Sequence, residues 1–424
     1  MAALTKGVFV VAAKRTPFGT FGGKFVKKSI TDLQEVANKA VIASSGLRPD
    51  QIDSVVIGNV NACSSSDGAF MPRHAALRAG IPIDRPALGV NRLCGSGFQA
   101  VVNGAQNILV GDSKVVLTGG AENMSQSPYV ARDIRFGTTL GAPLNLEDSL
   151  WVGLTDSYCK TPMAVTAENL AEQYKIPREE VDQFSYRSQV LWKKAHDGGH
   201  FKEELVPVTV KVKGKEQVVD VDEHPRPQTT LEGLAKLPAI FKKGGVVSAG
   251  SASGIVWCTI ILYFTININQ IWILMYFQGI SDGAGALILA SEEAVKEYGL
   301  KPLARLVAYG VVGVEPTIMG IGPAPAIQNV LKVSGLQLND IDLVEINEAF
   351  AAQTLACQKE LKLDLEKLNV NGGAIALGHP LGASGARITT HLVHELRRQK
   401  KKYGIGSACI GGGQGIAVLL ESIH

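Results

Sequence analysis

Two motifs in the first third of the chain recur in its last third at nearly the same spacing. Ser45-Gly46-Leu47-x-x-x-x-Ile52-Asp53 returns as Ser334-Gly335-Leu336-x-x-x-x-Ile341-Asp342, so that Gly335 lies 289 residues after Gly46. Leu93-Cys94-Gly95-Ser96-Gly97 returns 288 residues later as Leu381-Gly382-Ala383-Ser384-Gly385. In both copies a strand-like segment begins 18 residues after the last glycine, at Val115 and at Tyr403. This repeat predicts a duplicated domain whose equivalent loops meet around a pseudo-twofold axis.

Apolar runs typical of strands alternate with helical patterns along the first 120 residues. We predict strands at 8–13, 52–60 and 114–121, and helices at 32–45, ended by Gly46, and directly after Cys94. This alternation indicates an α/β fold with a mostly parallel sheet covered by helices. A chain of 424 residues also exceeds the size of a single core. We therefore predict two halves, 1–292 and 293–424.

Residues 123–252 differ from both halves and are predicted to form a loop domain inserted into the first. Charged, amphipathic patterns indicate helices at 166–174 and 177–196, the alternation at 208–221 indicates a hairpin, and 224–230 is predicted to be an irregular loop.

An apolar stretch at 255–278 contains no charged residue and is long enough to span a membrane. Removing 256–280 leaves a continuous Ser-Gly-Ile-Ser-Asp-Gly, so we favour translated non-coding sequence or a gene-model error. The alternatives are a real buried or looped insertion and, less favoured, a membrane segment. Asn267, Asn269 and Gln270 near its middle are costly in lipid.

Composition indicates which partners, metals and cellular compartments to expect. The net charge of +3, without a basic stripe, argues against nucleic acid. The six cysteines lack metal-ligand spacing, so we expect no metal, no disulfide scaffold and a reducing compartment. The first 31 residues carry six Lys and Arg but no Asp or Glu, which suits mitochondrial import. Because 8–13 also reads as a core strand, we expect any targeting segment to remain uncleaved.

Four Gly-rich or strand-end motifs carry the candidate chemistry: Cys94 in NRLCGSGF, Asn347 in VEINEAFA, His379 in GGAIALGHPLGASG and Cys409 in GSACIGGGQG. Cys94 precedes a helix, whose N-terminus is expected to lower the thiol pKa and favour a nucleophile. His379 can supply a base, Cys409 can move a proton, and the N–H groups around Gly411 suit an oxyanion.

Each residue also has a structural interpretation. Cys94 and Cys409 are possible small core residues, and His379 a satisfied structural histidine. Asn347 and Glu348 can instead cap a helix beginning near Ala349.

Taken together, the four motifs, the duplicated halves and the central loop domain resemble the thiolase family along nearly the whole chain except 256–280. The resemblance implies a layered αβαβα arrangement of two βαβαβ halves. It implies that Cys94 attacks the 3-keto carbon of a 3-ketoacyl-CoA and becomes acylated, that His379 activates it, and that Cys409 protonates the acetyl-CoA enolate and later deprotonates CoA. Asn347, through a water, and His379 would form one oxyanion hole, and the N–H groups of Cys94 and Gly411 the other.

The resemblance further implies that coenzyme A is a co-substrate, with no resident cofactor, and that the protein is a homo-oligomer. Family positions contacting CoA or lining the acyl or pantetheine channel match Arg226, Thr229, Ser253, Met319 and Phe350. A solvated surface charge for Arg226 and ordinary core packing for Met319 and Phe350 are the alternatives.

The predicted activity is thiolysis of 3-ketoacyl-CoA in mitochondrial fatty-acid β-oxidation. Its nearest rival is condensation of two acetyl-CoA by an acetyl-CoA C-acetyltransferase. Two other classes stay open: a thiolase-fold chain inactivated or membrane-tethered by 256–280, and a redox protein working through a Cys94–Cys409 disulfide.

Overall fold

The computed structural model describes residues 2–3, 7–253 and 280–424. The predicted insertion at 256–280 therefore lies, apart from Ile280, outside the described residues. Eleven strands form one sheet, nine of them in the order β15-β16-β17-β14-β2-β13-β6-β4-β5. The other two are short: β1 (Ala2–Ala3) pairs with β14, and β3 (Gly19–Thr20) pairs with β13. The nine are β2 (Val8–Arg15), β4 (Ser54–Gly58), β5 (Ala87–Val90), β6 (Val115–Asn123), β13 (Ser281–Ser291), β14 (Ala304–Gly313), β15 (Leu343–Ile346), β16 (Tyr403–Ile410) and β17 (Gln414–Ser422).

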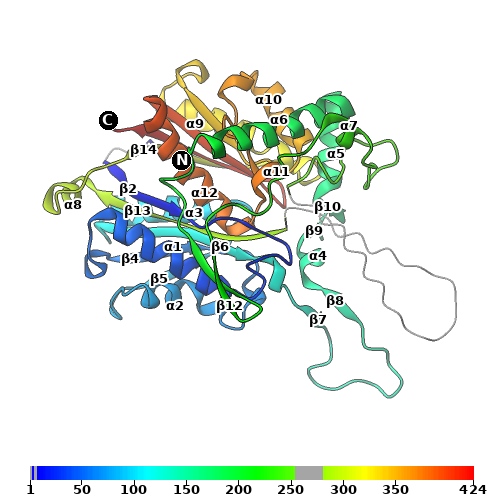
Figure 1. The fold of residues 1–424 in the computed structure, drawn as a ribbon, viewed down its shortest axis with the longest axis horizontal. Helices are drawn as coiled ribbons and strands as arrows, with labels where there is room; N and C mark the ends of the chain where they lie inside the picture. Colours follow the sequence, from blue (N-terminus) through cyan, green and yellow to red (C-terminus); the bar gives the residue numbers. More distant parts are fainter. Residues whose placement is uncertain (1, 4–6, 254–279) are drawn as a thin grey trace.

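Helices divide the molecule into five layers (Figure 1). α3 (Ser96–Val110) and α12 (Leu381–Gln399) lie in the middle and share one apolar core with strands of both halves. α1 (Ile30–Ser45) and α2 (Met71–Arg78) cover the outer face of the first half. α9 (Pro323–Ser334) and α10 (Ala351–Leu361) cover that of the second. The αβαβα arrangement is confirmed, although pairing of β2 with β14 joins the two sheets into one.

The repeat is visible element by element, because β4, α3 and β6 correspond to β15, α12 and β16. One expectation is wrong: the sheet is mixed, not mostly parallel. β13 runs antiparallel to both β6 and β2, and β17 runs antiparallel to both β16 and β14. In the second half the reversal is a tight turn at 411–413, which lets the chain fold straight back as a hairpin. At the equivalent place in the first half the loop domain intervenes.

Local signals explain the predicted elements. α1 begins two residues before the predicted start, with Ser29 and Asp32 forming a capping box, and ends at Gly46 in the left-handed region with φ 79°. At two other glycines, counterparts in the repeat, α3 and α12 touch. A Cβ on Gly97 would lie 2.5 Å from Ala386 N, and one on Gly385 would lie 2.2 Å from Phe98 N. The repeated glycine motif therefore permits close approach of the two central helices.

The loop domain contains the predicted helices as α5 (Met163–Gln173) and α6 (Arg178–Asp197), followed by the predicted hairpin β11 (Val208–Val212) and β12 (Lys215–Val219). A second hairpin, β7 (Tyr129–Ala131) and β8 (Leu146–Asp148), opens into an arm that projects from the molecule (Figure 1). Residues 224–230 form the predicted irregular loop.

Arg15 at the end of β2 attaches the loop domain to the sheet. Its guanidinium donates to Glu204 over 2.6 Å and to the two carboxylate oxygens of Asp222 over 2.7 and 3.1 Å. All three side chains are buried, and His391 of α12 lies 2.7 Å from the other Glu204 oxygen. One ionic cluster thus joins β2, the loop domain and a central helix.

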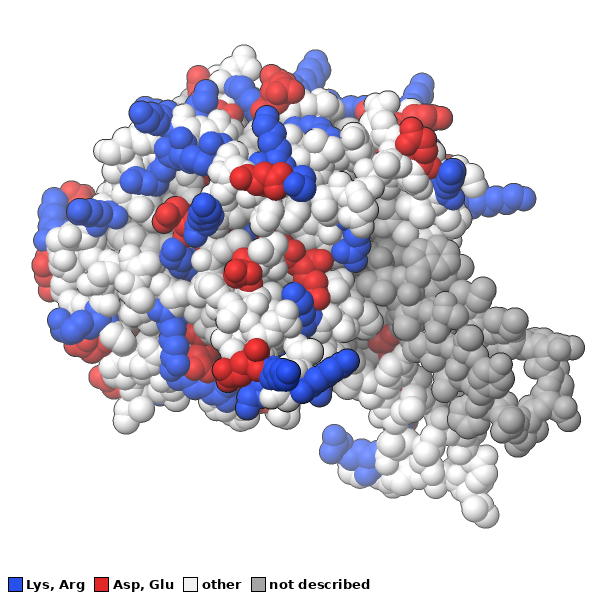
Figure 2. Space-filling model, viewed as in Figure 1, with Lys and Arg blue, Asp and Glu red and all other residues white. Residues whose placement is uncertain are grey.

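The surface shown in Figure 2 carries interspersed basic and acidic side chains. Among the helices of the described ranges, none combines the length and apolarity needed to cross a bilayer.

Candidate active site

Cys94 lies in a turn between β5 and α3. Leu93, directly before it, adopts the left-handed region with φ 45°, a conformation that costs a non-glycine residue about 1–3 kcal/mol and is concentrated at functional sites. Gly95 is the N-cap of α3. Cys94 is partly exposed and packs against an apolar cluster that includes Leu381, two residues after His379. The turn therefore brings the thiol beside the histidine loop of the other half.

The expected lowering of the Cys94 pKa is wrong. Desolvation by the surrounding side chains raises the pKa of this partly exposed thiol to about 11, although the nearby N–H groups of Gly411 and of Cys94 itself act in the opposite direction. Desolvation disfavours the thiolate more than these N–H groups favour it. The thiol is thus neutral at physiological pH and requires a base.

His379 lies in the loop before α12 and is buried. Its Nδ1 is 2.5 Å from Ser384 Oγ, whose hydroxyl donates to Pro380 O over 3.2 Å. This network assigns the proton to Nδ1 and leaves Nε2 as an acceptor, 3.3 Å from Asn347 Nδ2. Burial lowers the pKa of His379 to about 3, so the imidazole is neutral in the free protein and its Nε2 carries no proton.

Asn347 follows β15 and is fully buried. Its Oδ1 has no hydrogen-bond partner among the described residues, which leaves an acceptor for a water beside His379. The alternative that Asn347 or Glu348 caps a helix is wrong, since Phe350 is the N-cap of α10. Glu348 instead accepts from Ser188, Asn369 and the Ile375 N–H and braces the loop before His379.

Cys409 lies near the end of β16, and Gly411 begins the β16–β17 turn. Burial raises the pKa of Cys409 well above its usual value, and neighbouring Cys94 adds to this shift. Both cysteines are free thiols. Cys409 shares an apolar cluster with the buried Met319 and Phe350, so these two predicted channel residues adjoin the second thiol.

Arg226 and Thr229 line a cavity of about 370 Å³ that reaches Ala252 and Ile375. The guanidinium of Arg226 donates to the carbonyl of His224 over 2.6 Å. Ser253, next to Ala252, is buried and donates through both its N–H and its hydroxyl to Ala349 O, each over 3.2 Å. The cavity therefore runs from the exposed loop at 226–230 to Ala252, which pairs with Phe350 in an isolated bridge.

Two residues near the candidate active site, Ser384 and Glu122, were not predicted from the sequence. Ser384 orients His379, and its place in the repeat, as the counterpart of Ser96, was a usable signal. Glu122 in GAEN lies fully buried at the end of β6. A single acidic residue at a strand end carries no distinctive sequence pattern, so only the fold reveals it.

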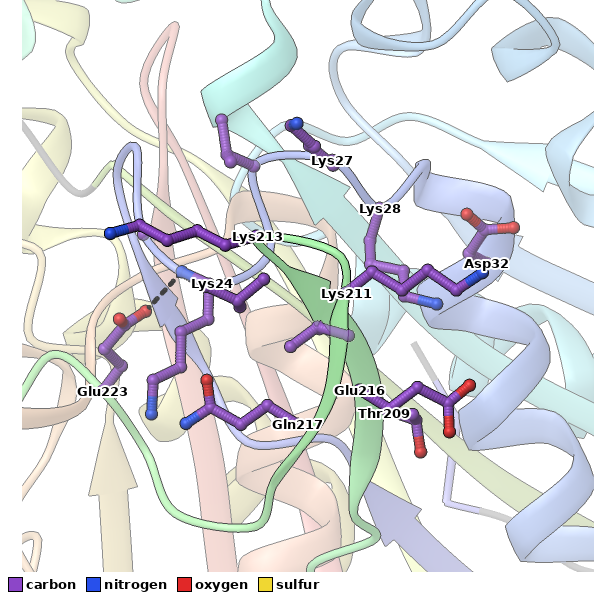
Figure 3. A pocket seen from close by; sticks show the side chains of 14 residues that line it. Lys24, Lys27, Lys28, Asp32, Thr209, Lys211, Lys213, Glu216, Gln217 and Glu223 are labelled. Carbon is purple, nitrogen blue, oxygen red and sulfur yellow. Dashed lines mark hydrogen bonds between the residues drawn. The ribbon is translucent and has the colours of Figure 1, made fainter.

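A larger hollow of about 910 Å³ lies elsewhere, between the loop at 23–28 and the β11–β12 hairpin (Figure 3). Five lysines line it: Lys24, Lys27, Lys28, Lys211 and Lys213. None of the predicted site residues contributes to it. Across the described part of the chain, no group of three or more His, Cys, Asp or Glu is placed to hold a metal ion.

Two models of one known protein family match the two halves of the chain. Residues 8–258 match the family described as "Thiolase, N-terminal domain", and residues 300–422 match "Thiolase, C-terminal domain". The human protein named "3-ketoacyl-CoA thiolase, mitochondrial" is 56% identical over 420 residues, 99% of each chain. An acetyl-CoA acetyltransferase of Syntrophomonas wolfei is 41% identical over 424 residues, 99% of this chain and 100% of its own.

Solved structures agree in fold. Human mitochondrial 3-ketoacyl-CoA thiolase superposes with a TM-score of 0.92 at 56% identity, covering 99% of this chain and 100% of its own. The same human enzyme in complex with CoA gives a TM-score of 0.91, covering 100% and 99%. The Bacillus anthracis acetyl-CoA acetyltransferase gives 0.90 at 43% identity, covering 100% of both chains.

Proposed function

The chain belongs to the thiolase family, and on that premise we propose that the site around Cys94 cleaves 3-ketoacyl-CoA with free CoA. The products are acetyl-CoA and an acyl-CoA two carbons shorter. The observation that carries the proposal is that Gly411 N–H lies near enough to the Cys94 thiol to act on its pKa, because this brings the nucleophile of one half beside the β16–β17 turn of the other.

The first half-reaction begins with transfer of the Cys94 proton to His379 Nε2. The thiolate adds to the 3-keto carbon, the C2–C3 bond breaks, and its electron pair passes to C2 as the acetyl-CoA enolate. The Cys409 thiol protonates that carbon, and acetyl-CoA leaves. The acyl group stays on Cys94 as a thioester.

In the second half-reaction, the Cys409 thiolate accepts the proton of incoming CoA, whose sulfur attacks the acyl carbonyl. Cys94 leaves as thiolate and recovers its proton from His379. The N–H groups of Cys94 and Gly411, which both act to lower the pKa of the thiol, would serve one oxyanion. His379 and a water on the unpartnered Asn347 Oδ1 would serve the other.

Coenzyme A would bind in the cavity at Arg226 and Thr229, with the nucleotide at the exposed loop and pantetheine extending past Ala252 toward the neighbouring Ser253. Met319 and Phe350 would line the inner channel beside Cys409. We place the boundary between the halves at 292/293, after β13.

The comparisons with mitochondrial relatives assign the chain to the mitochondrion. We propose that it self-associates there. The sheet ends at β5, whose edge exposes Leu88, and the β7–β8 arm exposes Phe136 and Leu140 almost completely. Unpaired edges and apolar side chains of this kind are normally covered.

The test compares 3-ketoacyl-CoA substrates of increasing chain length with acetoacetyl-CoA in the presence of CoA. We expect turnover of the long substrates, and loss of at least about 1,000-fold in Cys94→Ala. Activity confined to the four-carbon substrate would instead favour the acetyl-CoA C-acetyltransferase, the second candidate suggested by the bacterial relatives.

A further inference from the structure

Glu122 is a fully buried carboxylate that the mechanism above does not use. Its Oε1 accepts from Asn61 N–H over 2.9 Å and from Asn59 Nδ2 over 3.1 Å. Its Oε2 accepts from Val60 N–H over 3.1 Å and from Gly382 N–H over 3.0 Å. Three of these donors belong to the loop after β4, and the fourth belongs to the other half of the molecule.

The loop after β4 leads directly to the nucleophile. Val60 donates its N–H to Glu122, and its carbonyl accepts from Asn91 Nδ2 over 3.1 Å. Asn91 Oδ1 in turn accepts from Leu93 N–H over 2.9 Å. Leu93 is the residue with positive φ before Cys94, so this chain of bonds fixes the turn that aims the thiol.

Gly382 leads to the base. It lies in the first turn of α12, three residues after His379 and two before Ser384, which bonds Nδ1. An added Cβ on Gly382 would lie 2.8 Å from Ala121 O and 3.0 Å from Glu122 Oε2. The first turn of α12 therefore packs directly against the Glu122 carboxylate, with no space for a side chain at position 382.

We propose that Glu122 is the positioning residue that holds the Cys94 turn and the His379 loop in register with one another. This inference rests on the proposed function only for the catalytic roles of Cys94 and His379, and not for the hydrogen bonds that align them. A carboxylate suits this role because its two oxygens accept all four N–H groups, whereas a carboxamide would turn an NH2 toward two of them.

Burial raises the pKa of Glu122 to about 7, opposed by the same N–H donors. Its charge also contributes to the raised pKa of Cys94. Removing the charge of Glu122 should therefore change the pKa of Cys94, whereas misaligning the two loops should change kcat.

The experiment compares Glu122→Gln with Asp282→Asn. Asp282, on the adjacent β13, is also buried with a pKa raised by burial to about 7, but its carboxylate accepts from Ser125 N–H over 3.0 Å and from Ser125 Oγ over 2.5 Å, outside the catalytic loops. We expect Glu122→Gln to lower kcat about 10- to 100-fold with KM changed less than about threefold. Asp282→Asn is expected to keep kcat within about twofold at a comparable loss of Tm.

Alkylation of Cys94 by iodoacetamide gives a readout that needs no thiolase substrate. Glu122→Gln should move its pH midpoint downward, and Glu122→Asp, which keeps the charge but shortens the reach, should leave the midpoint near that of the wild type while kcat still falls. An unchanged kcat in Glu122→Gln, or an equal fall in Asp282→Asn, overturns the proposal. An inactive wild type whose Cys94 alkylation still responds to Glu122→Gln and not to Asp282→Asn contradicts the proposed function alone.

Discussion

At Cys94, desolvation by the surrounding side chains outweighs the effect of a helix N-terminus on the thiol pKa. A helix N-terminus contributes about 0.3–1 kcal/mol to a nearby negative charge. Desolvation shifts the pKa of a buried group by up to about 3–5 units, at 1.36 kcal/mol per unit. Desolvation is the larger effect here, so both the Cys94 thiol and the His379 imidazole are neutral in the free protein.

This balance predicts the pH dependence of Cys94 alkylation in the free enzyme. Because the pKa is raised to about 11, the thiolate fraction and the alkylation rate should keep rising from pH 7 to pH 10. A thiol activated in advance would already reach its plateau near pH 7. Mass spectrometry of the Cys94 peptide measures the rate, with Cys94→Ser as the blank. A plateau by pH 8 contradicts the assignment.

At the scale of elements, the buried cluster at Arg15 holds the loop domain on the sheet. Arg15 projects from β2, whereas Glu204 and Asp222 belong to the loop domain, and all three lie out of water. The Asp222 carboxylate also accepts from Phe18 N–H over 2.8 Å. Loss of the cation would leave two buried charges without their partner.

We therefore expect Arg15→Met to lower the free energy of unfolding by about 3–5 kcal/mol. Arg48→Met is the matched control, because Arg48 pairs with Asp50 on the exposed surface and its loss should leave the denaturation midpoint unchanged. Urea denaturation followed by circular dichroism measures both. Equal midpoints for the two variants would show that the cluster contributes little.

At the scale of the whole molecule, two exposed features favour assembly. The β5 edge terminates the sheet, and the arm between β7 and β8 presents Phe136 and Leu140 to solvent. Burying two such side chains in an interface is worth about 1.5–3 kcal/mol each. The arm therefore suits a contact between copies of the chain.

The double variant Phe136→Asp/Leu140→Asp is expected to sediment as a smaller species than the wild type while keeping its thiolase activity. Val218→Asp is the control, since Val218 is an exposed apolar residue on the separate β11–β12 hairpin. Sedimentation velocity distinguishes the species. A sedimentation coefficient identical to that of the wild type would show that the β7–β8 arm does not contribute to the interface.

The sequence by itself determined the local features. Periodicity and capping residues placed α1, α5, α6 and the β11–β12 hairpin, because these elements depend on neighbours within a few residues. The repeat, carried by glycines that permit close approach, predicted which loops meet. Motif chemistry then identified Cys94, Asn347, His379 and Cys409 as the candidates.

Only the tertiary structure decided the properties that arise between distant segments. The antiparallel course of β13 depends on strands separated by the loop domain, so the local pattern of β13 could not reveal it. The raised pKa of Cys94 and the four-donor site of Glu122 depend on burial and on partners up to 317 and 260 residues away. Burial and long-range hydrogen bonding are properties of the packed molecule, which is why the sequence named the reacting groups and the fold determined their protonation and alignment.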